Sequence, residues 1–235
     1  MTAGEQRRQR LVTALEGVIP DAVHGVFRLN DHHLNRVPTA AHAAMSTVAG
    51  WWVLAYAVPV TDEGLWVWHH HGEYRSLMAN YVLARAREAM QASAAAGGEE
   101  LVSLTRLTSE GVSMVEVGEL AGLGNRGWNN LLLHPRYGSW LQIEALATPE
   151  PLGAETPAVP EDVCVKCMNC INDCPAGALS VDDFDAVPCA QLVAAPWNPR
   201  SRAIALTAQT YIECRECINS CPIGEQPEGI LAWRR

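Results

Sequence analysis

The sequence predicts an α+β protein in two parts, an α/β N-terminal part followed by a cysteine-rich part. Strand-like and helix-like segments alternate up to about residue 148, a pattern typical of a mixed sheet with packed helices. Residues 149–163 then carry four prolines, which remove backbone donors and interrupt regular structure. All eight cysteines follow this segment. We therefore expect domains at 1–148 and 164–235, joined by a proline-rich linker.

Hydrophobic periodicity identifies the elements of the first part. Near the start, helical spacing relates Leu11, Ala14, Leu15 and Val18. Apolar or β-branched runs predict strands at 49–60, 64–70, 101–106, 130–134 and 139–146. Helices are expected over 73–96, before a glycine pair, and after Ser113, which has capping-box spacing with Glu116.

Composition and charge favour some classes of protein over others. The formal charge is −9, from 17 basic and 26 acidic residues, so phosphate backbones are repelled and nucleic acid is an unlikely partner. The N-terminus has no secretory signal, and the longest apolar run, about a dozen residues, is too short to cross a bilayer. We expect a cytoplasmic protein with no membrane contact. In that reducing compartment, clustered cysteines bind metal or perform redox chemistry.

The cysteines follow the spacing of two iron–sulfur clusters. The runs read CVKCMNCINDCP and CRECINSCP, with a single cysteine between them. In bacterial ferredoxins, three thiolates of such a run hold one cubane, and the fourth, just before proline, holds the other. This logic assigns one [4Fe-4S] cluster to Cys164, Cys167, Cys170 and Cys221, and a second to Cys174, Cys189, Cys214 and Cys217.

Two other readings of the cysteines are weaker. Structural zinc prefers paired CxxC knuckles, often with histidine, but no histidine follows residue 134. Four disulfides would suit a small secreted chain. The cysteine-rich part is therefore expected to carry one electron at a time through iron–sulfur clusters.

The segment before the cysteines resembles a known family. Residues 121–152 contain AGLG at 121–124, Gly127, NNLLL at 129–133 and YGSW at 137–140. This arrangement is similar to the segment that precedes the cluster domain in epoxyqueuosine reductases and corrinoid-dependent reductive dehalogenases. The lone Cys189 and a strand ending in proline near residue 59 also match. The resemblance covers roughly residues 49 to 224.

The resemblance implies a nitroreductase-like α/β domain that holds a corrinoid, followed by a two-cluster bacterial-ferredoxin-like domain. It implies corrinoid contacts at Gly122, Gly124, Gly127, Tyr137, Gly138 and Ser139. Glycine permits close approach to a bulky ligand, although a helix C-cap and tight turn would also explain the loop. Tyr137 is the expected proton donor. Glu110 is the only carboxylate where epoxyqueuosine reductases carry their general acid.

A histidine triplet offers a further candidate site. In an alternating strand, His69 and His71 share one face and could ligate cobalt or deliver protons, whereas a solvated strand edge is the alternative.

The sequence thus predicts an iron–sulfur oxidoreductase. Single electrons would pass from a reduced ferredoxin or flavodoxin, through two [4Fe-4S] clusters, to a corrinoid (cobalamin) site that reduces a small organic substrate. The alternative is an electron-transfer partner that reduces a corrinoid protein and has no substrate of its own. A closed pocket with a proton donor would favour the enzyme.

Overall fold

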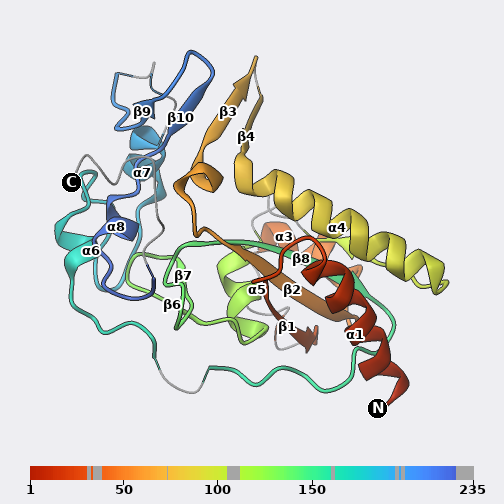
Figure 1. Ribbon diagram of the computed structural model, residues 1–235. Helices are drawn as coiled ribbons and strands as arrows, with labels where there is room; N and C mark the ends of the chain where they lie inside the picture. The colour runs from red at the N-terminus through yellow and green to blue at the C-terminus, as the bar shows by residue number, and fades with distance from the viewer. Residues whose placement is uncertain are drawn as a thin grey trace. The chain divides into compact units, whose positions relative to one another are not determined.

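The computed structural model describes residues 1–30, 33, 39–72, 74–104, 112–159, 162–193, 196 and 199–225. Helices and strands mix along the whole described chain, which confirms the predicted mixed α/β character (Figure 1). The helices are α1 (Ala3–Glu16), α3 (Thr39–Ser46), η1 (Glu63–Trp66, 3-10), α4 (Met78–Ala96), α5 (Met114–Leu120), α6 (Asn169–Asn172), α7 (Ala186–Leu192) and α8 (Glu216–Asn219). The strands are β1 (Val23–Arg28), β2 (Trp52–Pro59), β3 (Trp68–His71), β4 (Tyr74–Leu77), β5 (Val102–Ser103), β6 (Asn125–Arg126), β7 (Leu132–Leu133), β8 (Leu141–Thr148), β9 (Ile204–Ala205) and β10 (Thr210–Ile212).

The fold separates into two compact units that interleave along the sequence. Unit 1 consists of Met1–Pro59, Val82–Asn125 and Gln142–Glu161, and unit 2 of Val60–Tyr81, Arg126–Leu141 and Asp162–Arg235. Two stretches from the first part of the chain therefore belong with the cysteine-rich part. The functional division predicted at residues 149–163 stays a prediction.

Unit 1 is built on the sheet with strand order β1-β2-β8-β5. Strand β1 pairs antiparallel with β2, from Val23 opposite Ala57 to Arg28 opposite Trp52. The apolar run of β2 is buried along almost its whole length, as expected for a strand covered on both faces. Helix α1 begins with a capping box between Thr2 and Glu5, and α5 begins at Ser113, whose hydroxyl accepts from the Glu116 amide.

The proline-rich segment is an ordered strap on the edge strand β1. The Thr156 amide donates to the Val26 carbonyl at 2.8 Å, and the Val26 amide donates to Thr156 Oγ1 at 3.0 Å. The Arg28 amide donates to Glu155 Oε1 at 3.2 Å, and Arg8 of α1 donates to the Ala154 carbonyl. These contacts occupy the polar groups of an edge strand that would otherwise be open to pairing.

Unit 2 contains a second sheet, with strand order β4-β3-β10-β9. Strands β3 and β4 form a hairpin that leads directly into α4 (Figure 1). Strand β10, just before the second cysteine run, pairs antiparallel with β3, with Tyr211 opposite Trp68. Helices α6 and α8, one from each cysteine run, pack together, and Asn169 Nδ2 donates to the Ser220 carbonyl.

Three predicted element boundaries are wrong. Residues 64–66 form the 3-10 turn η1, because the Asp62 carboxylate caps the Gly64 amide at 2.6 Å, so the strand is only β3. Residues 74–77 form β4, since pairing with β3 overrides their helical pattern, and α4 begins at Met78. In the run 130–134 only Leu132–Leu133 is a strand, because Asn130 adopts a left-handed turn conformation.

Candidate metal centre

The first cysteine run is a tightly curled loop. Lys166 and Met168 have positive φ angles of 57° and 66°, which non-glycine residues rarely adopt. The loop then enters the single turn of α6, where the amides of Ile171 and Asn172 donate to the Met168 carbonyl. This path allows thiols three residues apart to face one region of space, which a straight helix or strand would prevent.

The thiols of the first predicted set influence one another electrostatically. Burial raises the pKa of the Cys170 thiol, and the charges of Cys221, Cys164 and Cys167 raise it further. Burial likewise raises the pKa of Cys221, and Cys167 and Cys164 add to the shift. Because such interactions fall with distance, these thiols lie near one another, although Cys221 is remote in sequence.

The second predicted set behaves in the same way. Burial raises the pKa of Cys217 to about 12, with contributions, in decreasing order, from Cys214, Cys189, Cys174 and Cys170. Burial also raises the pKa of Cys189, and Cys174 and Cys214 raise it further. The lone Cys189 therefore belongs with this group. The small effect of Cys170 on Cys217 indicates that the two sets are neighbours.

The thiols of the first predicted set gather around one hollow of unit 2. Within the described residues, no three His, Cys, Asp or Glu side chains converge closely enough to hold one metal ion. The thiols of the first set line a hollow with, from elsewhere in unit 2, Trp128, Asn129 and Leu133.

A buried ion pair anchors the second cysteine run. Arg215, between Cys214 and Cys217, donates to Glu63 Oε1 at 2.7 Å, and both side chains are almost fully buried. The Arg215 guanidinium also lies over the Trp140 ring. Sequence reasoning missed both residues. Glu63 is far from Arg215 along the chain and has no distinguishing local pattern, so only the tertiary structure reveals the pair.

The glycine loop of the matched segment packs against protein. Gly122 has a positive φ of 71° after α5, and a Cβ there would overlap the Pro157 carbonyl. A Cβ at Gly127 would meet the Leu133 side chain at 2.6 Å. Gly124 is buried. Buried Ser139 accepts a hydrogen bond from Asn129 Nδ2 at 2.7 Å.

Tyr137 lies in a tight turn formed by residues 134–138. The backbone groups of His134 and Gly138 form two mutual hydrogen bonds, of 3.0 and 2.8 Å. His134 Nδ1 accepts from the amides of Arg136 and Tyr137, at 3.1 and 3.3 Å, and its ring stacks on Tyr137. Burial, followed by the nearby Arg136, lowers the pKa of His134. Tyr137 is buried and lies under the Arg136 guanidinium. Its role as proton donor stays a prediction.

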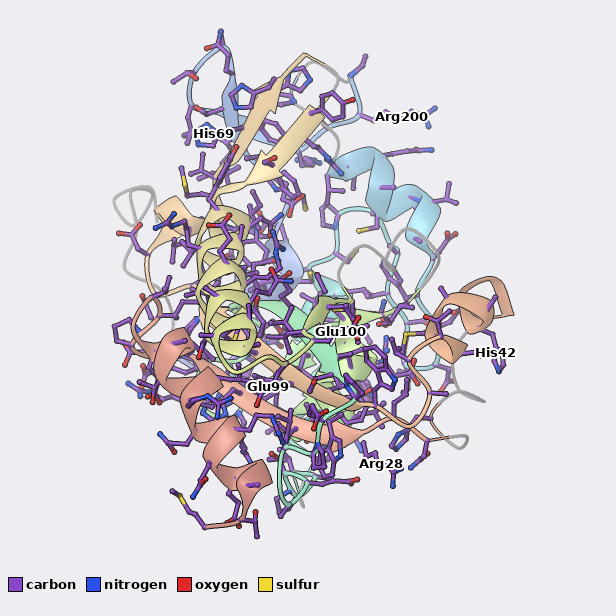
Figure 2. All side chains as sticks on the ribbon, turned by 90° about the vertical axis from the view of Figure 1, so that its right-hand side faces the viewer. Arg28, His42, His69, Glu99, Glu100 and Arg200 are labelled. Atoms are coloured by element: carbon purple, nitrogen blue, oxygen red, sulfur yellow. The ribbon has the colours of Figure 1, made fainter. Side chains whose placement is uncertain are left out.

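The other candidate residues are not tested by the fold. Glu110 lies outside the described residues. His69 and His71 do share a strand face, where their stacked rings have centroids 6.2 Å apart and an interplanar angle of 14°. Figure 2 labels His69. His69 lies opposite Thr210 of β10. A functional role for this pair stays a prediction.

Comparison with known proteins connects this geometry to a family. No family model matches the chain. An epoxyqueuosine reductase from Listeria monocytogenes is 44% identical over 68 residues, which are 29% of this chain and 17% of that protein. One from Bacillus subtilis is 36% identical over 75 residues, 28% of this chain and 19% of the relative. The matched segment thus spans less than a fifth of each relative.

Solved structures extend the likeness over most of the chain. A crystal structure of selenomethionine-labelled epoxyqueuosine reductase has a TM-score of 0.66 at 18% identity, covering 93% of this chain and 66% of that one. The catabolic reductive dehalogenase NpRdhA, in complex with 3-bromo-4-hydroxybenzoic acid, has a TM-score of 0.57 at 18% identity, covering 85% and 29%. At these identities the likeness shows a shared fold.

One relative corrects an expectation about partners. A solved epoxyqueuosine reductase, with a TM-score of 0.61 at 16% identity over 81% of this chain and 57% of that one, is in complex with a tRNA stem loop. The prediction that nucleic acid is an unlikely partner is therefore not supported, because net charge does not describe local surface potential. Among the described residues, no helix is sufficiently long and apolar to span a membrane.

The sequence match and the shared fold confirm the predicted resemblance: the chain is similar in sequence to epoxyqueuosine reductases over the matched segment, and it shares its fold with them and with reductive dehalogenases.

Proposed function

We propose that the chain is an iron–sulfur oxidoreductase that relays single electrons through two [4Fe-4S] clusters. One observation carries the proposal: the four cysteines of the first predicted set, including Cys221 from the second run, line one hollow of unit 2, as ferredoxin spacing predicts. On this reading the cysteine-rich part is a two-cluster ferredoxin-like module, and unit 1 is nitroreductase-like. The acceptor is the reduction site of a small organic substrate.

Each group of the chain has a defined task in this proposal. Burial raises the pKa of five of the proposed ligand thiols, so bound iron must displace their protons and supply the positive charge that stabilises the thiolates. These five are Cys170, Cys189, Cys214, Cys217 and Cys221. Cys167 is exposed, and Val165 beside it is 61% exposed. This edge of the first set is where a reduced ferredoxin or flavodoxin would deliver electrons. The four cysteines of the second set are each partly buried.

The corrinoid contacts expected at Gly122, Gly124, Gly127, Tyr137, Gly138 and Ser139 stay a prediction. The space that a Cβ would take at Gly122, Gly127 and Gly138 is filled by protein, so these positions offer no cradle to a flat macrocycle. Ser139 is buried and hydrogen-bonded to Asn129. We therefore assign no step to a corrinoid at these residues.

This packing favours a second candidate function. In it, the chain is an electron-transfer partner that reduces a corrinoid protein and has no substrate of its own. Both functions need the two clusters, and they differ in whether the chain itself retains a corrinoid.

Metal analysis of the anaerobically purified chain tests the proposal. After cluster reconstitution, incubation with cobalamin and desalting, we expect about eight irons per chain. Stoichiometric cobalt with a Co(II) EPR signal would assign the corrinoid-dependent reductase. Eight irons without cobalt would assign the electron-transfer partner.

Iron content also provides the result that would contradict both functions. One tightly bound zinc per four cysteines, with no iron after reconstitution, would remove the redox role. An unrelated protein of similar size, incubated with cobalamin and desalted in the same way, controls for cobalamin that adheres nonspecifically.

A further inference from the structure

The loop that carries Cys221 is held by backbone contacts with the turn 134–138. This loop comprises residues 221–225 and supplies the only ligand of the first set that comes from the second cysteine run. A Cβ at Gly138 would overlap the Ile223 carbonyl, and a Cβ at Gly224 would overlap the Gly138 amide nitrogen. Both glycines have positive φ angles, of 56° and 89°. The backbone of the turn 134–138 and the backbone of the loop 221–225 therefore lie too close together for a side chain to fit between them.

Hydrogen bonds fix the register of this contact. The Glu225 amide donates to the Arg136 carbonyl at 2.7 Å, and the exposed side chains of the same residues pair at 3.2 Å. The turn is rigid because the Nδ1 atom of His134 accepts from two of its amides. Leu133, immediately before the turn, lines the hollow beside the first set. The turn thus continues the wall of that site.

We propose that the turn 134–138 is a clamp that positions Cys221 as the fourth ligand of the first cluster, with Gly138, Gly224 and His134 as positioning residues. The inference rests on the proposed two-cluster function. A loop ending in Pro222-Ile223-Gly224 has no helix or strand of its own to fix the thiol. The clamp supplies that restraint, and it places Tyr137 on the same rigid turn.

Two glycine variants test the clamp. Gly138→Ala and Gly224→Ala are each expected to hold about four irons per chain after reconstitution, against about eight in the unchanged protein. Gly72→Ala is the matched control, because Gly72 also has a positive φ, of 63°, but has open space around it. It is expected to hold about eight irons. Glycine variants that also hold eight would overturn the clamp.

Combined variants identify which cluster is lost. In a Cys221→Ser background, where the first cluster is already absent, Gly138→Ala should remove no further iron. In a Cys189→Ser background, where only the first cluster is left, Gly138→Ala should remove nearly all of the remaining iron. Loss of the remaining cluster in the Cys221→Ser background instead would contradict a specific effect on the first set.

If alanine at Gly138 or Gly224 disturbs folding, a milder pair of variants at His134 still tests the clamp. Asparagine places Oδ1 close to the position of histidine Nδ1, so His134→Asn retains the acceptor for the turn amides, and His134→Ala removes it. His134→Ala should lose iron to a chelator roughly three to ten times faster than the unchanged protein, the effect of about one hydrogen bond. His134→Asn should lose iron at the original rate. Equal rates for the two variants would overturn the clamp, whereas fewer than eight irons in the unchanged protein would overturn the two-cluster function.

Discussion

At the scale of single residues, a buried carboxylate organises unit 1. Glu144 on β8 is 2% exposed and accepts from the Tyr56 hydroxyl at 2.8 Å and from the Ser103 hydroxyl at 3.1 Å. It also pairs with Arg87 of α4. Burial, followed by the charge of Glu144, raises the pKa of Tyr56, which therefore remains a donor at any physiological pH. The network ties three strands, β2, β5 and β8, to helix α4.

Removing the Tyr56 hydroxyl should destabilise the fold, because the buried Glu144 carboxylate loses a hydrogen-bond donor. Tyr56→Phe leaves Glu144 without one of its hydrogen bonds and should lower the free energy of unfolding by about 1–3 kcal/mol. Chemical denaturation of the apo chain measures it. Tyr81→Phe, the same change at a side chain that is 47% exposed, should stay within about 0.5 kcal/mol. Equal effects for the two variants would show that the network contributes nothing.

The chemistry of single residues was predictable only where spacing carries it. The cysteine sets follow from the intervals between residues, and the fold brings Cys221 to the hollow that the first run lines. The assignment of all eight cysteines to two clusters stays a prediction. The supporting residues were not predictable. Arg215 looks like any surface arginine until Glu63 is found beside it, and His134 is one histidine before a proline. Their roles depend on partners that only tertiary packing supplies.

At the scale of elements, the proline-rich segment that was predicted to be a linker is hydrogen-bonded to the edge strand β1. Four prolines predict an absence of helix and sheet interior, which holds at the described residues 149–159, 162 and 163, but they do not predict whether the segment moves freely. Here Thr156 exchanges two hydrogen bonds with Val26. Strand β2 was predictable from the sequence, because an unbroken apolar run requires burial. The short strands were not, since pairing partners decide them.

The strap should contribute measurable stability. Thr156→Val keeps the side-chain shape but removes the acceptor for the Val26 amide, so unfolding free energy should fall by about 1 kcal/mol. Hydrogen exchange at Val26 should speed up accordingly. Thr13→Val, on an exposed position of α1, is the control and should leave that amide unchanged. An unchanged exchange rate in Thr156→Val would mean that the strap does not protect β1.

At the scale of the whole molecule, each predicted cluster draws its ligands from distant parts of the sequence. The first takes thiols from one run and Cys221 from the other, and the second takes Cys174 from the first run. Helices α6 and α8 pack together to make this exchange possible. A mutation should therefore affect clusters according to the set, not according to the run in which a cysteine lies.

Paired cysteine variants can verify this assignment. Cys189→Ser should reduce the iron content from about eight to about four per chain. Adding Cys174→Ser should remove no further iron, because Cys174 and Cys189 are both assigned to the second cluster. Adding Cys221→Ser should remove the rest. The opposite pattern, with Cys174 and Cys221 exchanging these effects, would refute the assignment.

The interleaving of unit 2 also determines when the protein can mature. Its segments are separated by stretches of unit 1, so its contacts are of high sequence separation, which slows folding. On the ribosome, neither predicted ligand set has four thiols until Cys217 has emerged, although the first run is made much earlier. Its cysteines therefore wait, reduced and unliganded, during the synthesis of the rest. Cluster insertion must follow synthesis of the second cysteine run, and the nascent chain needs protection from oxygen and competing metals in that interval.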